Sequence, residues 1–169
     1  MKIGVPKEPE GENRVAITPL SMKKLLKAGF EVIVESGAGI ASNYLDADYE
    51  QAGATLGTRE QAMACDTIIS IRFPGLEGTS KGSKIACVAD PFRHPEHVTS
   101  CIENGITLLS MDMIPRRLSR AQSMDVNSSQ DNLAGYKAVL LGAAHVPKAI
   151  PMMTTSAGTV RPAKVVIMG

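Results

Sequence analysis

Short apolar runs alternate with longer amphipathic segments through the first two thirds of the sequence, and this alternation constrains the fold more than any other feature. The apolar runs have the length of strands, and the segments between them have the apolar spacing of surface helices. Strands are predicted at residues 2–5, 31–36, 67–73, 84–90 and 106–114, and helices at residues 19–28, 45–54, 58–66 and 95–105. Repeated strand–helix–strand units predict an α/β fold, with a parallel, flavodoxin- or Rossmann-like sheet and helices on both faces.

Local signals support several of these boundaries. Thr18 followed by Pro19 is typical of a helix start, and Gly29 is typical of a helix end. Residues 106–114 are almost continuously apolar, so that strand is expected to be buried on both faces.

The composition excludes several functional classes. The net charge is +1, and aromatic residues make up only 4% with no Trp, so no nucleic-acid partner is expected. The three cysteines are far apart and form no C-x-x-C pair, which argues against a disulfide framework and a zinc site and favours a reducing cytoplasm. No apolar stretch approaches the roughly 20 residues of a membrane span, so neither a signal peptide nor direct membrane insertion is expected.

Three short motifs allow both a functional and an ordinary structural interpretation. Residues 37–42, GAGIAS, have the G-x-G spacing of a dinucleotide loop, but polar residues follow and a plain turn is favoured. His94 and His97 could form a metal pair, yet Pro95 lies between them and they are interpreted as surface histidines, so no metal site is predicted. Arg14 could hold a carboxylate or a phosphate, but an ion pair with Glu8, Glu10 or Glu12 is favoured.

A long polar loop, beginning near Ile114, is the strongest candidate for function. It contains three arginines together with Gln122 and Asp125, and few apolar groups fix it to a core. Its side chains could converge on a ligand, or it could be a solvated connection, and composition leaves both open.

The segment after this loop is expected to begin with a long helix. Ser128, with Asp131 three positions later, resembles an N-cap, and the helix is predicted to continue to about His145 before Pro147. A turn at residues 161–162 and a strand at residues 165–168 are expected next. That strand leads into Gly169, the position of the first glycine of a G-x-G-x-x-G turn.

The polar loop and its flanks resemble a known family. The string IPRRLSRAQSMDVNSSQDNLAGYKAV and the later MMTTSAGTVRPAKVVIMG are similar to the NAD(H)-binding alpha subunit of proton-translocating NAD(P) transhydrogenases. The opening VPKEPEGENRVAITP, the ESGAG segment and DADYEQAGA resemble the amino-terminal domain that these proteins share with alanine dehydrogenases. The resemblance covers essentially the whole chain.

The resemblance implies a set of site residues at the nicotinamide. Arg117, Gln122 and Asp125 match the signature positions of the family's catalytic loop, with Arg116 as an alternative to Arg117. Ser128 matches a hydroxyl that the family places near the nicotinamide carboxamide, and Gly169 matches the nucleotide-binding turn. Asn127 departs from the pattern, since an apolar residue is expected there.

The resemblance also implies an activity and partners. The activity is hydride transfer between NAD(H) on this subunit and NADP(H) on a partner subunit. Membrane and NADP-binding transhydrogenase subunits are the implied partners, within a homo-oligomer such as a dimer. The implied location is cytoplasmic, peripheral to the membrane through those subunits.

The resemblance also divides the chain into three parts. Residues 1–127 are the amino-terminal domain with its loop, residues 128–150 an interdomain helix, and residues 151–169 the first segment of a truncated NAD-binding domain. The isolated chain is expected to be inactive and to expose apolar side chains of the helix or bury them by self-association. Whether the chain is a truncation, a proteolytic product or a split gene is left open.

Two alternatives remain. An alanine dehydrogenase-like fragment would use the equivalent of Arg14 for its substrate, but its lysine and histidine fall at residues 71–74 and 89–92, where this sequence has IRFP and ADPF. A non-catalytic module that pairs with a separate NAD-binding chain is the other alternative.

Overall fold

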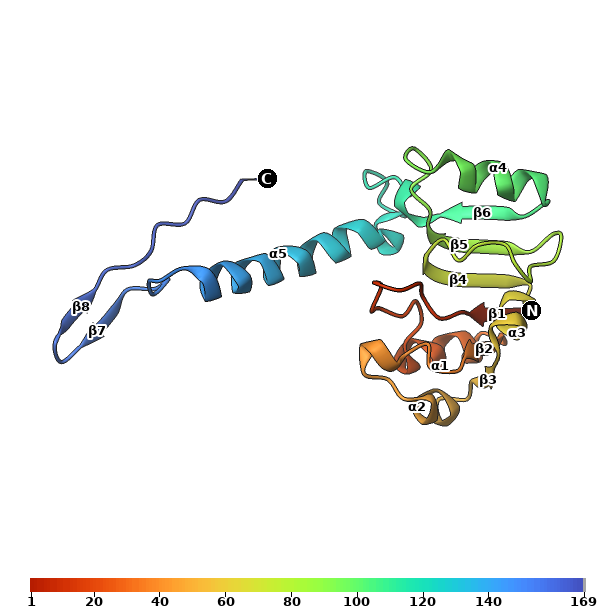
Figure 1. The fold of residues 1–169 in the computed structure, drawn as a ribbon, viewed down its shortest axis with the longest axis horizontal. Coiled ribbons are helices and arrows are strands. Elements are labelled where there is room, and N and C mark those ends of the chain that lie inside the picture. The colour runs from red at the N-terminus through yellow and green to blue at the C-terminus, as the bar shows by residue number, and fades with distance from the viewer. Residues whose placement is uncertain (169) are drawn as a thin grey trace. The chain divides into compact units, whose positions relative to one another are not determined.

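The computed structural model describes residues 1–168 and contains two units, Met1–Asp125 and Val126–Gly169, which are described separately. The first unit contains a sheet, flanking α-helices and three short 3-10 helices (Figure 1). Its strands are β1 (Lys2–Val5), β2 (Glu31–Glu35), β3 (Thr55–Gly57), β4 (Thr67–Arg72), β5 (Lys84–Val88) and β6 (Thr107–Ser110). Its helices are α1 (Pro19–Lys27), α2 (Asp46–Gln51), α3 (Arg59–Met63), α4 (Pro95–Glu103), η1 (Ile40–Ser42), η2 (Met111–Met113) and η3 (Gln122–Met124).

The sheet is parallel throughout and has the strand order β3-β2-β1-β4-β5-β6. In Figure 1 the strands follow one another from β6 at the top to β3 at the bottom, with α4 beside β6. The order reverses between β1 and β4, as in doubly wound nucleotide-binding folds. The predicted α/β class with a Rossmann-like parallel sheet is confirmed.

The alternation of side chains along β1 explains why both faces of the sheet are covered. Ile3 and Val5 are buried in the same apolar cluster as Met22 of α1. Gly4 points to the other face, where a Cβ would lie 1.8 Å from the backbone oxygen of Ala62 in α3. A second cluster contains residues from α3, β4, β5 and α4, including Met63, Ile68, Ile85, Cys87 and Cys101.

The start and end of α1 confirm the local signals. The Thr18 side chain accepts a hydrogen bond from the Ser21 backbone N–H, and Pro19 is the first helical residue. Gly29 follows the helix with a φ of +84°, a conformation that suits glycine.

The two outer strands differ from the sequence prediction. Burial of β6 on both faces is wrong, because β6 is an edge strand with alternating exposed and half-buried residues. Residues 111–113, predicted as its continuation, form η2. The short strand β3 was not predicted, since its three residues form no apolar run and it pairs only at the opposite edge of the sheet.

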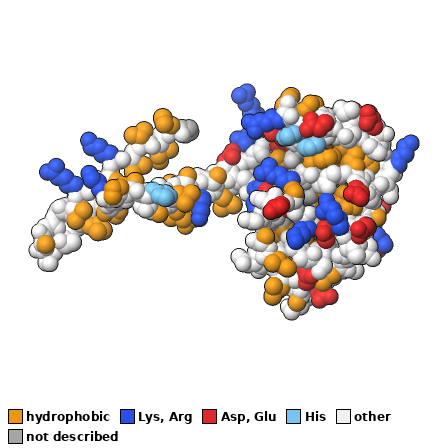
Figure 2. All heavy atoms as spheres, in the orientation of Figure 1, with side chains coloured by type: hydrophobic (Ala, Val, Ile, Leu, Met, Phe, Trp, Pro, Cys, Tyr) orange, Lys and Arg blue, Asp and Glu red, His pale blue; other side chains and the backbone are white. Residues whose placement is uncertain are grey.

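The second unit consists of α5 (Val126–His145) and a hairpin of β7 (Met153–Thr155) and β8 (Gly158–Val160). Hydrophobic side chains lie on its surface (Figure 2), and α5 has no buried residue. None of the helices in the described part of the chain is long and apolar enough to cross a membrane.

Two expectations for this unit are wrong. The helix begins at Val126, so Ser128 lies within its first turn and does not precede it. The strand predicted at residues 165–168 does not form, because no strand among the described residues pairs with it. The strands of this unit instead come from the preceding segment, where Gly158, with a φ of +128°, begins β8 beside the turn.

Candidate functional site

The carboxyl ends of β1 and β4 meet where the strand order reverses, the usual position for a ligand in an open parallel sheet. Glu8 follows β1 and binds the end of β4. Its Oε1 accepts a hydrogen bond from the Ile71 N–H at 2.5 Å, and its Oε2 accepts one from the Arg72 N–H at 2.9 Å. Burial raises the pKa of Glu8 although these two N–H groups favour the ionised form.

Glu12 lies between two arginines at the same edge. Arg14 donates from Nε to Glu12 Oε1 at 2.7 Å and from Nη2 to Oε2 at 2.6 Å, while Arg72 Nε lies 3.2 Å from Oε2. The hydrogen bonds from Arg14 hold the pKa of Glu12 at about 2. The predicted ion pair between Arg14 and a nearby glutamate is therefore confirmed, with Glu12 as the partner.

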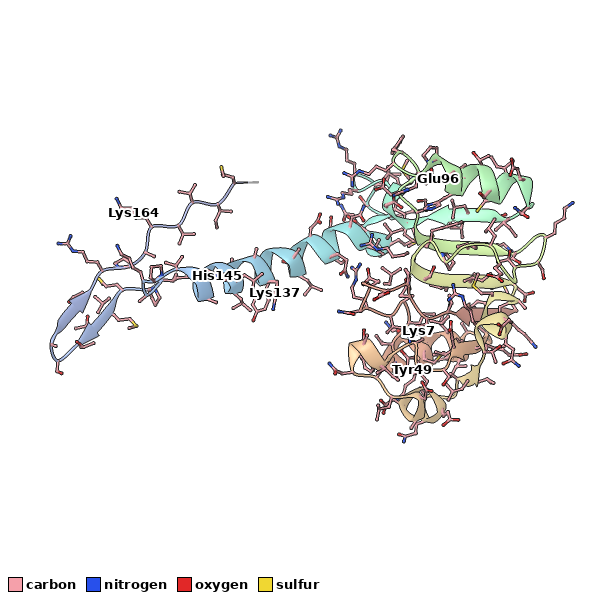
Figure 3. All side chains as sticks on the ribbon, viewed as in Figure 1. Lys7, Tyr49, Glu96, Lys137, His145 and Lys164 are labelled. Atoms are coloured by element: carbon pink, nitrogen blue, oxygen red, sulfur yellow. The ribbon has the colours of Figure 1, made fainter. Side chains whose placement is uncertain are left out.

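Arg59 connects the loop after β1 with the end of β2 and with the segment after β4. Its Nη1 donates to the Lys7 backbone oxygen at 3.1 Å and lies 3.3 Å from Glu35 Oε2, and its Nη2 donates to the Pro74 backbone oxygen at 2.9 Å. Lys7, marked in Figure 3, belongs to the loop after β1. These contacts fix the backbone at the carboxyl edge of the sheet.

The GAGIAS segment is a turn, as predicted. The Gly37 N–H donates to Asp46 Oδ1 at 2.8 Å, and the Ser36 hydroxyl donates to the other oxygen of the same carboxylate. Residues 40–42 form η1. A backbone N–H that could have bound a phosphate is thus bound by a carboxylate of the chain itself.

The polar loop, residues 114–125, follows η2 and consists of turns that end in η3. Ala121 is its buried residue, and its N–H donates to the Leu118 oxygen at 2.9 Å. The Gln122 N–H donates to the same oxygen at 3.2 Å. The backbone is therefore ordered while most side chains remain exposed.

The predicted site residues lie differently within this loop. Asp125 is 9% exposed in its side chain, and its Oδ2 lies 3.9 Å from Nε of Arg116, which is 52% exposed. Arg117 and Gln122 are exposed, and Gln122 is the first residue of η3. The structure thus brings Arg116 to Asp125 and presents Arg117 and Gln122 at the surface, and the choice of signature arginine remains open.

The two other predicted cofactor-binding residues fall elsewhere. Ser128 is exposed in the first turn of α5, in the second unit. Gly169 lies outside the described residues.

The structure places a carboxylate beside the two histidines, a contact that was not predicted from the sequence. Glu96, marked in Figure 3, joins His94 and His97 at the beginning of α4, and one ligand atom from each lies within 4.8 Å of the others. Glu96 follows Pro95 in the same short string, so its spacing was a signal that the sequence offered.

The roles of Glu8 and Arg59 were missed as well. Each contacts a segment far along the chain, and the sequence pattern around neither residue indicates that contact. The three cysteines are buried and unpaired, and burial raises the pKa of Cys87 to about 12.

Comparison with known proteins gives one family. Residues 4–134 match the model of the alanine dehydrogenase/PNT N-terminal domain. The first part of NAD(P) transhydrogenase subunit alpha from Rhodospirillum rubrum is 44% identical over 180 aligned residues, which cover 100% of this chain and 47% of the relative. Alanine dehydrogenase 1 of Staphylococcus aureus is 34% identical over 148 residues, covering 85% of this chain and 38% of that protein.

Structural comparison agrees with the sequence comparison. The crystal structure of transhydrogenase from Sinorhizobium meliloti superposes with a TM-score of 0.91 and 42% identity, covering 96% of this chain and 50% of that chain. The chain therefore spans about half the length of the transhydrogenase proteins just described.

Proposed function

The chain belongs to the alanine dehydrogenase/PNT N-terminal domain family, and from this membership we propose that it serves as the amino-terminal part of an NAD(P) transhydrogenase alpha subunit. In this role it contributes to an NAD(H) site from which hydride passes to NADP(H) on a partner subunit. Other transhydrogenase subunits are the proposed partners, and they place the chain at the cytoplasmic side of a membrane.

The observation that carries the proposal is the ordered backbone and exposed polar side chains of residues 114–125. Arg117 and Gln122 extend from turns whose backbone is fixed by hydrogen bonds. The side chain of Asp125, at the end of the loop, is 9% exposed, and its Oδ2 lies 3.9 Å from Arg116 Nε. The guanidinium and amide donors of this loop are therefore carried by an ordered backbone, which reduces the cost of positioning them around a ligand.

These side chains fit the nicotinamide half of a dinucleotide. A guanidinium fork suits a phosphate, and an amide side chain can both donate to and accept from a carboxamide. We assign Arg117 to holding the nucleotide by charge-assisted hydrogen bonds and Gln122 to bridging toward the second nucleotide. Asp125 is proposed to orient Arg117 and Gln122, and Ser128 to contribute a hydroxyl near the carboxamide.

Positioning is sufficient for the proposed chemistry. Bound nicotinamides supply the hydride donor and acceptor, so the chain needs neither a nucleophile nor a proton donor. Holding reacting groups at the right distance and angle can supply roughly 7–11 kcal/mol of a barrier. Arg117, Gln122 and Asp125 are accordingly proposed to bind and orient, and to help exclude water.

An alanine dehydrogenase-like activity is the second candidate. It is favoured by Arg72 at the carboxyl end of β4 and Arg14 in the segment between β1 and α1, because both guanidinium groups contact the Glu12 carboxylate. The site lacks the expected histidine, however, because Ala89 and Asp90 follow β5. The transhydrogenase role is therefore preferred.

Titration of the ¹⁵N-labelled chain with NADH, followed by backbone amide NMR, tests the proposal, and weak binding is expected because the chain spans about half the length of its transhydrogenase relatives. Saturable shifts should be concentrated in residues 114–125. Arg117→Ala and Gln122→Asn should each weaken binding about tenfold, since the first removes a charge-assisted hydrogen bond and the second withdraws the amide by one methylene group. Arg93→Ala, which removes an 83% exposed arginine paired only at 3.7 Å with Asp90, is the matched control and should have no effect. Shifts that avoid the loop, or equal losses in the control, would refute the assignment.

A further inference from the structure

Three side chains with metal-binding atoms meet where α4 begins: His94, Glu96 and His97. We infer that this chain binds Zn²⁺ through these three residues, none of which belongs to the proposed nucleotide loop. The inference goes beyond the proposed function, because hydride transfer uses none of the three. It also departs from the interpretation of the histidines as plain surface residues, which had not included Glu96.

His97 is held as metal-binding histidines usually are. Its Nδ1 lies 3.0 Å from the backbone oxygen of Ala89. A carbonyl oxygen can only accept, so Nδ1 carries the hydrogen and the lone pair of the neutral ring is on Nε2. The ring also stacks on Phe73 with centroids 4.1 Å apart. A backbone carbonyl behind the ring and a packed aromatic beside it fix the direction in which Nε2 points.

His94 and Glu96 supply the other two ligands. His94 Nδ1 and Glu96 Oε1 are 2.9 Å apart, joined by a hydrogen bond in which the imidazole donates. A metal ion can take the place of that hydrogen once the neutral ring has shifted its proton to Nε2. Both side chains are exposed, at 51% for His94 and 63% for Glu96, so they can move to meet the ion.

A modest rearrangement completes the geometry. One potential ligand atom of each residue lies within 4.8 Å of the others, whereas tetrahedral zinc with bonds of about 2.0 Å needs separations of roughly 3.3 Å. The rings of His94 and His97 are stacked with centroids 5.0 Å apart, and parallel rings cannot aim their lone pairs at one point. The exposed His94 ring therefore turns out of the stack while His97 keeps its place.

The donor set selects zinc over the hard cations. Two imidazole nitrogens and one carboxylate suit a borderline metal, whereas Ca²⁺ and Mg²⁺ prefer oxygen ligands. The positive end of the α4 dipole disfavours a cation there, and the charge of Glu96 offsets it.

Competition of the full chain with a chromophoric zinc chelator measures the affinity. We expect one Zn²⁺ bound with a micromolar dissociation constant. His94→Gln and Glu96→Gln should each weaken binding about tenfold or more, because each removes one of three ligands. The change at His94 is on the surface and leaves the fold intact. His145→Gln, at the exposed end of α5, is the matched control and should bind zinc as the unaltered chain does.

Imidazole NMR of the same samples gives a second readout. Zn²⁺ should shift the ring signals of His94 and His97 and leave those of His145 in place. Binding weaker than millimolar would overturn the inference, as would an affinity unchanged by His94→Gln or a shift confined to His145. NADH binding by the zinc-free chain is independent of all these outcomes, so the two proposals can fail separately.

Discussion

At the residue scale, two carboxylates of the chain itself bind arginine and backbone N–H groups at the edge where a doubly wound sheet usually binds its ligand. Glu12 is held by Arg14 and Arg72, and Glu8 closes on the N–H groups of Ile71 and Arg72. The sequence predicted an ion pair for Arg14 because several glutamates, Glu12 among them, lie just before it. It could not predict the contacts with residues 71 and 72, which depend on β1 and β4 lying side by side.

Replacing Glu12 with Gln tests the energetic role of this cluster. Arg14 lowers the pKa of Glu12 from the ordinary 4.5 to about 2, so the ionised form stabilises the fold. That contribution is fully present above about pH 4.5 and is lost as the pH falls to about 2. The side chain is only 9% exposed, so Glu12→Gln should cost about 1–3 kcal/mol at pH 7.

Urea unfolding at pH values from 7 to 2 measures this difference. The stabilities of the original chain and the variant should converge across the acid range. Glu31→Gln is the control, because Glu31 is 73% exposed and its contact with Lys2 is 3.8 Å long, so its effect should stay below about 0.5 kcal/mol. An equal loss in both variants, or a difference that persists to pH 2, would contradict the account.

At the element scale, the amphipathic alternation was enough to predict the central strands and the helices between them. The predictions failed for segments whose burial or pairing depends on which strands lie beside them. The apolar run of β6 predicted burial on both faces, yet β6 has only β5 beside it. The apolar residues 165–168 likewise predicted a strand, but a strand needs a partner to satisfy its backbone groups. Apolar spacing indicates which side chains of a segment can be buried, but it does not indicate which elements pack beside that segment.

The packing of α3 on β1 gives an element-scale prediction at Gly4. A Cβ there would lie 1.8 Å from the Ala62 backbone oxygen, so Gly4→Ala must push α3 off the sheet. The expected loss is about 3 kcal/mol or more in the free energy of unfolding. Gly75→Ala is the comparison: its Cβ meets nothing within 4 Å and only a φ of +82° opposes it, which costs about 1–2 kcal/mol. Thermal unfolding measures both variants. Similar losses of stability in the two would show that α3 can move away from β1 at little cost, and would contradict the prediction.

At the scale of the whole molecule, the two units differ in how much they bury. The first has two apolar clusters, one on each face of its sheet. In the second, exposure or self-association was predicted for apolar residues of the long helix and its end, and Leu133, Val139 and Leu140 of α5 and Val146 just after it are exposed. Exposure or self-association of these residues in solution remains a prediction. That prediction followed from the family resemblance, which implies that further parts of the subunit cover this helix, because large uncovered apolar patches rarely persist on a soluble monomer.

The candidate site, too, could be predicted only in part from the sequence. The polar loop was located from its composition and its resemblance to the family, because exposed arginines and an amide need no distant partner to be recognised. The contact between Arg116 and Asp125 could not be foreseen, since the turns between them set their separation. The roles of Arg117 and Gln122 in binding remain predictions.

The central claim, that residues 114–125 position a nicotinamide for hydride transfer, is tested most directly by transhydrogenation. The rate from NADH to an NADP analogue is measured in the complete assembly that contains this chain. Arg117→Ala and Gln122→Asn should each lower the rate about tenfold or more, with circular dichroism and melting temperature unchanged, because both side chains are exposed. Normal turnover accompanied by a large loss of thermal stability would contradict the claim and make the loop a structural element.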